Sequence, residues 1–216
     1  MEVATVQQRE VPVIWRPMTE DEFVAWCNED VRAEYVDGEV IVHSPVSTRH
    51  SDLAGFLGSL LRLFVERHQI GKVLGPEIQV RLRPGVRRVP DLLFLSAERL
   101  EQVAPNHIEG APDLMVEIVS PESVSRDWRD KFLEYQAAGV AEYWVIDPDH
   151  RRAEFYALDD QGAYRLLPIE EGIVRSQAVA GFWLRPEWLW EEPLPSVLDV
   201  ARQLGVIGSE AAAKQK

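Results

Sequence analysis

Two almost unbroken apolar stretches constrain the fold of this chain most. They read VPDLLFL over residues 89–95 and APDLMVEIVS over residues 111–120. A strand that is apolar on both faces lies inside a sheet that is covered on both sides. One acid interrupts each apolar run, Asp91 in the first and Glu117 in the second, whereas Asp113 stands before the second run begins. An isolated ionised carboxylate is costly in an apolar interior, so these two groups should be paired, protonated or bound to a metal.

Asp91 and Glu117 are therefore candidates for a metal site. If their strands are neighbours, both carboxylates reach one edge of the sheet, and a hard cation such as Mg²⁺, with Mn²⁺ as a substitute, would relieve their repulsion. Such an ion polarises a phosphoryl oxygen and lowers the pKa of a bound water. The structural alternative makes Asp91 a turn residue after proline and pairs Glu117 with an arginine such as Arg88. The functional interpretation is favoured because an acid interrupts the apolar pattern in both of two successive strands.

The remaining pattern predicts an α/β domain over residues 1–200, with its core at about 18–185 and a polar tail at 201–216. It has a mixed central sheet flanked by helices and a C-terminal β-meander extension. The expected elements are a capping box at Thr19, a hairpin turn at 37–38, an amphipathic helix from 53 that ends before Gly71, an alternating strand at 77–83, one strand at 87–95 that is wholly apolar after Asp91, a helix at 121–139 capped by Ser123 or Ser125, a strand at 142–147, and a meander sealed by Trp183, Trp188 and Trp190.

Composition restricts the function classes. The only cysteine, Cys27, excludes an internal disulfide, and the chain has neither a signal-like start nor a membrane-length apolar run, so a cytoplasmic location is expected. A net charge of −13 is unfavourable for DNA binding unless basic groups are concentrated locally. The densest basic cluster is Arg81, Arg83, Arg87 and Arg88. A homo-oligomer could also assemble these arginines around one groove. Phosphate-loop, zinc-cluster and serine-elbow motifs are absent.

The ordered set of motifs resembles the Uma-type endonuclease family of the restriction-endonuclease-like PD-(D/E)XK superfamily. The resemblance covers about residues 18–185 and rests on AEYVDGEVIVHSP, a helix with His50 near its start, VPDLLFL, APDLMVEIVSPES, DKFLEYQAAGVAEYWVIDP and GFWL, in that order. It implies a restriction-endonuclease-like fold and a metal-dependent endonuclease that acts on DNA. The alternative is a catalytically inactive binding module of the same fold, which the acidic charge also suggests.

The same resemblance implies residue roles. Asp91 and Glu117 would bind the metal, with the Ile118 carbonyl as a third oxygen. The superfamily places a lysine two residues after the glutamate, but Val119 stands there. Lys131, fourteen residues after Glu117 on the following helix, is the expected substitute, and Lys72 is its only competitor. The structural alternative for Lys131 is an i,i+4 ion pair with Asp127.

Four further residues are secondary candidates. Glu34 matches an early acid of the family, which the resemblance would place among the catalytic residues, binding the metal directly or through water; the alternative is an exposed strand residue paired with an arginine. His50 is expected to form a hydrogen bond near the site rather than to act in catalysis. Gln79 could reach the edge of the site, although its strand face is expected to be solvated or to contact a second subunit. Asp113, in the second Pro-Asp pair, is expected to open a strand and is the fallback ligand.

Overall fold

A six-stranded mixed sheet forms the centre of the molecule, for which a computed structural model describes residues 17–28 and 31–208. Its strand order is β11-β10-β9-β8-β6-β3. The bounds are β3 Gly71–Leu74, β6 Leu92–Ser96, β8 Leu114–Ile118, β9 Glu142–Asp147, β10 Arg152–Leu158 and β11 Tyr164–Leu166. Only the β8–β9 pair is parallel among the neighbours in this sheet. Both expected apolar strands are thus confirmed as adjacent central strands.

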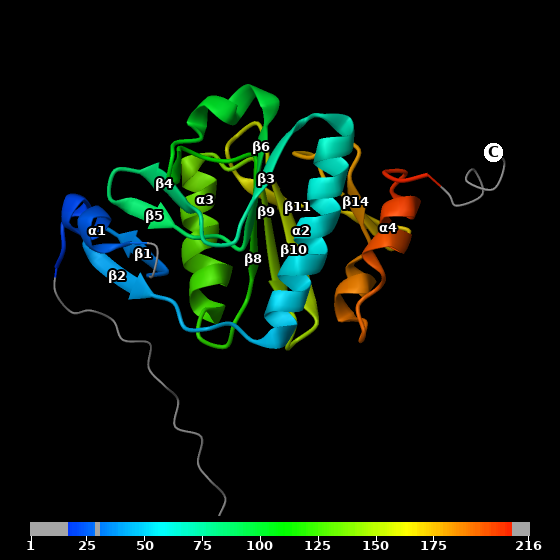
Figure 1. Cartoon of the computed structure of the whole chain (residues 1–216), viewed down its shortest axis with the longest axis horizontal. Helices are drawn as coiled ribbons and strands as arrows, with labels where there is room; N and C mark the ends of the chain where they lie inside the picture. Colours follow the sequence, from blue (N-terminus) through cyan, green and yellow to red (C-terminus); the bar gives the residue numbers. More distant parts are fainter. Residues whose placement is uncertain (1–16, 29–30, 209–216) are drawn as a thin grey trace, which may run out of the picture.

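Helices α2 (Thr48–His68) and α3 (Lys131–Ala138) cover opposite faces of this sheet (Figure 1). The alternation along β6 and β8 shows this directly. Leu92 and Val116 pack in the core that contains the apolar face of α2, whereas Leu93 and Met115 pack with Tyr135 of α3. The expected amphipathic helix is confirmed, and it ends at Gln69 in a left-handed conformation, before Gly71.

A smaller sheet has the order β2-β1-β5-β4-β7. Its strands are β1 Ala33–Val36, β2 Glu39–Val42, β4 Gln79–Arg83, β5 Val86–Arg88 and β7 His107–Glu109. Helix α1 (Glu20–Trp26) begins at the expected capping box of Thr19 with Glu22. The hairpin turn is also confirmed, because Asp37 and Gly38 have φ values of 46° and 103°. Such values favour glycine and aspartate in a tight hairpin.

The single strand expected at residues 87–95 is instead divided between the two sheets. β5 pairs with β1 and β4, whereas β6 pairs with β3 and β8. Val89 and Pro90 separate them, and proline has no N–H with which to continue a strand ladder. This division places Asp91 where the two sheets meet.

The C-terminal region also differs from expectation. β10 and β11 extend the central sheet, but β12 (Ile169–Glu170), β13 (Ile173–Arg175) and β14 (Trp183–Leu184) form a separate sheet. The rings of Trp183 and Trp188, the latter in the 3₁₀ segment η3 (Pro186–Trp190), lie 5.4 Å apart, and Trp190 packs beside the same core. Helix α4 (Val197–Gln203) packs on α2. A solvated tail was expected from about residue 201, yet Ala201, Leu204 and Val206 are buried in the core that contains α2. Residues 209–216 of the expected tail lie outside the described part of the chain.

The segment before α3 also differs from the helix that was expected there. Arg126–Asp130 form a π-helical turn, η2, that continues into α3, which ends at Gly139 as expected. Neither serine caps it: Ser125 makes no side-chain cap bond, and the Ser123 hydroxyl bonds Ser120 instead. A 3₁₀ segment, η1 (Ala97–Gln102), follows β6. Within residues 17–28 and 31–208, no helix combines the length and apolarity needed to cross a membrane.

Candidate active site

Asp91 lies directly before β6, opposite Glu117 in the extension of the β6–β8 register, which pairs Leu92 with Val116. Its carboxylate is almost fully buried. Oδ2 accepts a hydrogen bond from the Ile118 backbone N–H at 2.7 Å, and Oδ1 lies 2.9 Å from His50 Nε2 and 3.2 Å from Arg32 Nη2. Burial alone would raise the pKa of Asp91, but the bond with His50, the Ile118 N–H and the charge of Arg32 together lower it.

Glu117 extends from β8 toward α3 and is 3% exposed. Its Oε1 accepts a 2.6 Å hydrogen bond from the Tyr135 hydroxyl, and its Oε2 lies 2.9 Å from Lys131 Nζ. Burial raises the pKa of Glu117 to about 8 despite the opposing charge of Lys131, and the carboxylates of Asp127, Asp91 and Glu34 add to the rise. Proton uptake by Glu117 therefore relieves part of the repulsion between buried acids, which a cation would also do.

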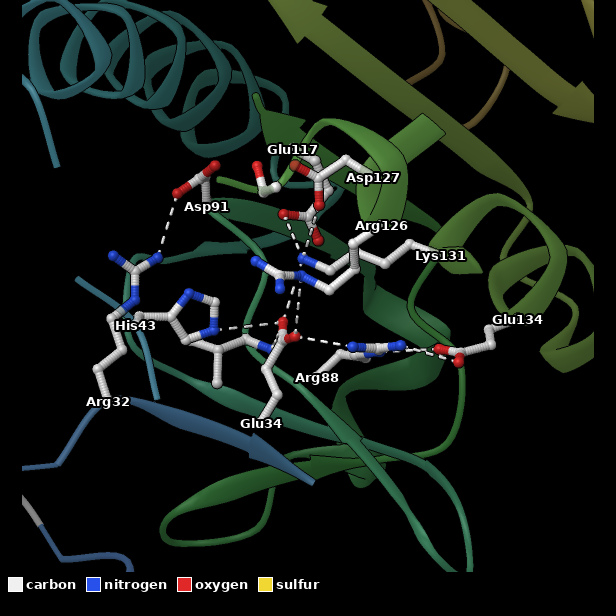
Figure 2. A network of polar contacts seen from close by, with 12 residues as sticks. Arg32, Glu34, His43, Arg88, Asp91, Glu117, Arg126, Asp127, Lys131 and Glu134 are labelled. Carbon is white, nitrogen blue, oxygen red and sulfur yellow. Dashed lines mark hydrogen bonds and ion pairs between the residues drawn. The ribbon is translucent and has the colours of Figure 1, made fainter. Parts of the chain in front are cut away.

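Lys131 is the common partner of three acids (Figure 2). Its Nζ lies 2.9 Å from Glu117, 3.1 Å from Glu34 and 3.3 Å from Asp127. Burial alone would lower the pKa of Lys131, but attraction to these carboxylates raises it above the ordinary lysine value. The lysine is therefore charged at neutral pH and cannot accept a proton. The i,i+4 contact with Asp127 that formed the structural alternative does occur, but it is the longest of the three contacts.

Glu34 reaches the same point from β1 in the smaller sheet. The structural alternative is wrong about exposure, because Glu34 is 0% exposed, but its pairing with an arginine is confirmed by Arg88. Its Oε2 accepts a 2.8 Å hydrogen bond from Arg88 Nη1, and the N–H of Val89 donates to Oε1. Burial alone would raise the pKa of Glu34, but Lys131 and Arg88 hold it well below its usual range. Arg88 also holds Glu134 of α3 with two further hydrogen bonds, so it pairs with these acids rather than with Glu117.

These groups line a pocket of about 320 Å³ that opens between the two sheets. Its lining includes Asp91, Glu117, Ile118, Asp127 and Lys131. The donor set suits a hard divalent cation: two buried carboxylates, backbone oxygen and room for water, which Mg²⁺ retains in most protein sites. Asp127 Oδ1 is in addition a buried acceptor without a hydrogen bond. The described residues contain no ready-made group of three His, Cys, Asp or Glu ligands, so backbone and water oxygens would have to complete the coordination.

The other sequence candidates lie in different surroundings. His50 contacts Asp91, as expected for a hydrogen-bonding residue beside the site. Gln79 instead contacts Cys27 and Arg87. Asp113 accepts a hydrogen bond from the N–H of Ser96, which fits the turn role expected of it. Lys72 is exposed on the edge strand β3, outside the pocket lining, so Lys131 is the lysine of this site.

The arginine cluster does not form an open basic surface. Arg81 and Arg87 both bind Glu20 of α1, Arg83 binds Asp37, and Arg88 is buried between its acids. Their positive charges are largely neutralised within the chain. The basic residues that line the pocket beside Lys131 are two other arginines and two histidines: Arg32, Arg126, His43 and His50.

Sequence reasoning missed four residues of the site: Asp127 as a buried acid, Arg32, His43 and Arg126. Asp127 lies four residues before Lys131 on one helical face, but the same spacing also describes an ordinary surface ion pair. Arg32 and His43 flank the hairpin that carries Glu34, and their proximity to Asp91 and Glu34 depends on how the two sheets meet. The spacing of residues in the sequence does not predict contacts that form between two sheets.

Fold and site together define a restriction-endonuclease-like α/β protein with acids and a lysine at the junction of its sheets. A family model described as "Putative restriction endonuclease", Uma2, matches residues 20–187. The chain belongs to this family, as the resemblance of its motifs implied. No curated protein matches it. Among solved structures, one titled as a putative nuclease belonging to DUF820 from Anabaena variabilis ATCC 29413 has a TM-score of 0.67 and 22% identity, and the match covers 81% of this chain and 98% of that one.

Proposed function

We propose that this protein is a Mg²⁺-dependent endonuclease that hydrolyses phosphodiester bonds in DNA. Asp91, Glu117 and the Ile118 carbonyl would be the metal ligands, and Lys131 would take the role of the lysine that is missing at Val119. The observation that carries the proposal is the 2.9 Å contact of Lys131 Nζ with Glu117 in the pocket that Asp91 also lines. Membership of a family described as "Putative restriction endonuclease" supports the reaction class.

A bound Mg²⁺ would polarise a phosphoryl oxygen and lower the pKa of a bound water. The side chains of the chain supply orientation and charge. His50 and the Ile118 N–H hold Asp91, and the Tyr135 hydroxyl holds Glu117, so neither carboxylate needs to reorganise. Lys131, being charged, acts as a hydrogen-bond donor to an oxygen in the pocket and stabilises the negative charge that develops there.

Glu34 and Asp127 would act as positioning residues through Lys131. A flexible lysine has about 2 kcal/mol of rotamer entropy, and contacts on several sides remove that freedom before substrate arrives. Glu34 supplies one such contact from the smaller sheet and Asp127 another from the π-helical turn. A fixed ammonium costs less reorganisation during the reaction than one that must be recruited.

The test is nicking of supercoiled plasmid, together with cleavage of linear DNA and of RNA, in Mg²⁺, Mn²⁺ and EDTA. Asp91→Asn and Glu117→Gln should each lower the rate by at least about 100-fold, the range seen when an electrostatic group of an active site is lost. Asp113→Asn is the matched control, because Asp113 also follows a proline but contacts Ser96 and Arg99 instead. Circular dichroism and thermal unfolding would show that all variants are folded.

Two results would contradict the proposal. Wild-type protein that cleaves none of these substrates with either metal supports the inactive binding module. Activity that survives both substitutions, or falls equally in Asp113→Asn, would place the chemistry elsewhere or in a contaminant. Titration of the metal-free protein with Mn²⁺ by calorimetry gives a second readout, since binding should be lost in Asp91→Asn and retained in the control.

A further inference from the structure

Four buried nitrogen atoms without a hydrogen-bond partner gather in the pocket. They are Arg32 Nε, Arg126 Nε, His43 Nε2 and His50 Nδ1. Outside this pocket, the described part of the chain has only one buried side-chain polar atom in this condition, Gln102 Oε1. A buried donor without an acceptor costs about 1–3 kcal/mol, so such a concentration in one place indicates a missing partner. The guanidinium groups can only donate, which makes that partner an acceptor.

Arg32 and Arg126 are not required as counter-ions for the site. Asp91 is already bound by His50 and by the Ile118 N–H, and Arg32 adds one contact at 3.2 Å rather than a two-pronged bridge. Glu34 is bound by Arg88 at 2.8 Å and by Lys131 at 3.1 Å, whereas Arg126 remains 4.0 Å away. Both guanidinium groups therefore retain N–H groups for a further ligand.

His43 also has a side-chain nitrogen that is available for a further ligand. Its Nε2 lies 3.6 Å from Glu34 Oε1, beyond the reach of a good hydrogen bond. Arg32, His43 and Arg126 line the same pocket as Asp91 and Glu117, and Figure 2 shows their side chains on one side of these two acids. The side chains of the two arginines are 23% and 20% exposed, so a ligand that enters from solvent can reach them.

We propose that Arg32, Arg126 and His43 form a phosphate-binding wall that holds the non-bridging oxygens of one phosphodiester of a nucleic-acid strand. Guanidinium groups match phosphate oxygens in geometry and charge. This explains how a chain of net charge −13 whose hairpin arginines are neutralised can bind a polyanion at one place. The nucleic acid as source of the phosphate rests on the proposed function, whereas the anion site itself rests on the unpartnered donors.

The test measures binding without cleavage. Fluorescence anisotropy with a labelled DNA duplex and with a labelled single strand, in EDTA and in Ca²⁺, compares wild type with Arg32→Gln, Arg126→Gln and the double variant. Arg129→Gln is the matched control on the same helical turn, since Arg129 is exposed and outside the pocket lining. Arg83→Gln, paired with Asp37 in the smaller sheet, is the second control.

Each pocket variant should weaken binding by roughly 5- to 30-fold, to a similar extent for DNA of unrelated sequences. The slope of log K against log salt should become less negative by about 1. The controls should change binding less than twofold. The wall is refuted if wild type binds neither strand form, or if the pocket variants bind as tightly as the controls. Cleavage assays separate the two proposals. If wild type cleaves DNA and the pocket variants bind DNA as tightly as wild type, the wall alone is refuted. If wild type binds DNA in a salt-dependent way that the variants lose, but does not cleave it, the nuclease alone is refuted.

Discussion

At the scale of single residues, Lys131 supports both the stability and the proposed chemistry. Removing its charge leaves Glu34, Glu117 and Asp127 with one cation fewer in a buried cluster. We expect Lys131→Met to destabilise the metal-free protein by about 3–5 kcal/mol at pH 7.5, the usual cost of breaking a buried ion pair on one side. Urea unfolding in EDTA measures it.

The exposed Lys72 gives the matched control for that substitution. Lys72→Met should change stability by less than about 0.5 kcal/mol, as most exposed substitutions do. If the free energy of unfolding of Lys131→Met is no lower than that of Lys72→Met, the ion pairs between Lys131 and the three acids do not stabilise the fold.

How far single residues could be predicted depends on the rule each one breaks. Asp91 and Glu117 interrupt apolar strands, so sequence alone made them candidates. The structural alternative named Arg88 as an example of a partner for Glu117, but Arg88 binds Glu34 and Glu134 instead. Asp127 broke no rule, because an acid four residues before a lysine is common on solvated helices. Its burial follows from the tertiary packing of η2 and α3.

At the scale of elements, helix α4 offers a paired test of the part of the chain that was expected to be solvated. Leu204, the residue directly after α4, is 8% exposed and packs in the core that contains α2, whereas Leu198 within α4 is 55% exposed. We expect Leu204→Ala to destabilise the protein by about 2–4 kcal/mol and Leu198→Ala by less than about 0.5 kcal/mol. Thermal or urea unfolding of both variants decides the matter, and equal effects would show that α4 does not belong to the core.

Helix α1 is joined to the smaller sheet by Glu20, whose carboxylate binds Arg81, Arg87 and the N–H of Gly85. The hydrogen bond from Arg81, with those from Gly85 and Arg87, outweighs burial and lowers the pKa of Glu20 from 4.5 to about 2. A lowered folded-state pKa gives stability that is present above pH 4.5 and is lost as the pH falls toward 2.

Glu20→Gln should therefore cost about 1 kcal/mol at pH 7, a value kept small by solvent screening at this partly exposed site. The difference from wild type should shrink between pH 4.5 and pH 2. Asp21→Asn, on the exposed face of the same turn, is the control and should change little at either pH. A Glu20→Gln deficit that is constant from pH 7 to pH 3 would contradict the role of this ionised carboxylate.

The elements themselves were predictable where the signal is local. The capping box of α1, the Asp37-Gly38 turn and the apolar central strands depend on neighbouring residues, and all are confirmed. The change of sheet at Val89-Pro90 was missed because an apolar, proline-containing stretch is equally compatible with one continuous strand. The π-helical turn at Arg126–Asp130 has no sequence signature either, yet it places Asp127 and Lys131 beside Glu117.

At the scale of the whole molecule, an excess of 36 acids over 23 basic residues must be reconciled with a DNA substrate. Arg81, Arg83, Arg87 and Arg88 carry charge that is already paired within the chain. If binding draws on the pocket cations instead, few counterions leave the DNA, and the salt dependence of binding should be shallow. The homo-oligomer suggested by the acidic balance remains a proposal that the same measurement can address.

The slope of log K against log salt on duplex DNA should be about −1 for one protomer, since the wall of Arg32, Arg126 and His43 holds one phosphodiester and each neutralised phosphate contributes about −0.9. A dimer that places two such pockets on one duplex should double it to about −2. Anisotropy from about 50 to 200 mM salt gives the slope, and analytical ultracentrifugation gives the oligomeric state in the same buffers. Arg83→Gln should leave the slope unchanged, because Arg83 is bound to Asp37. A steep slope near −8 that falls in Arg83→Gln would mean that the hairpin arginines exchange their acidic partners for phosphate on binding.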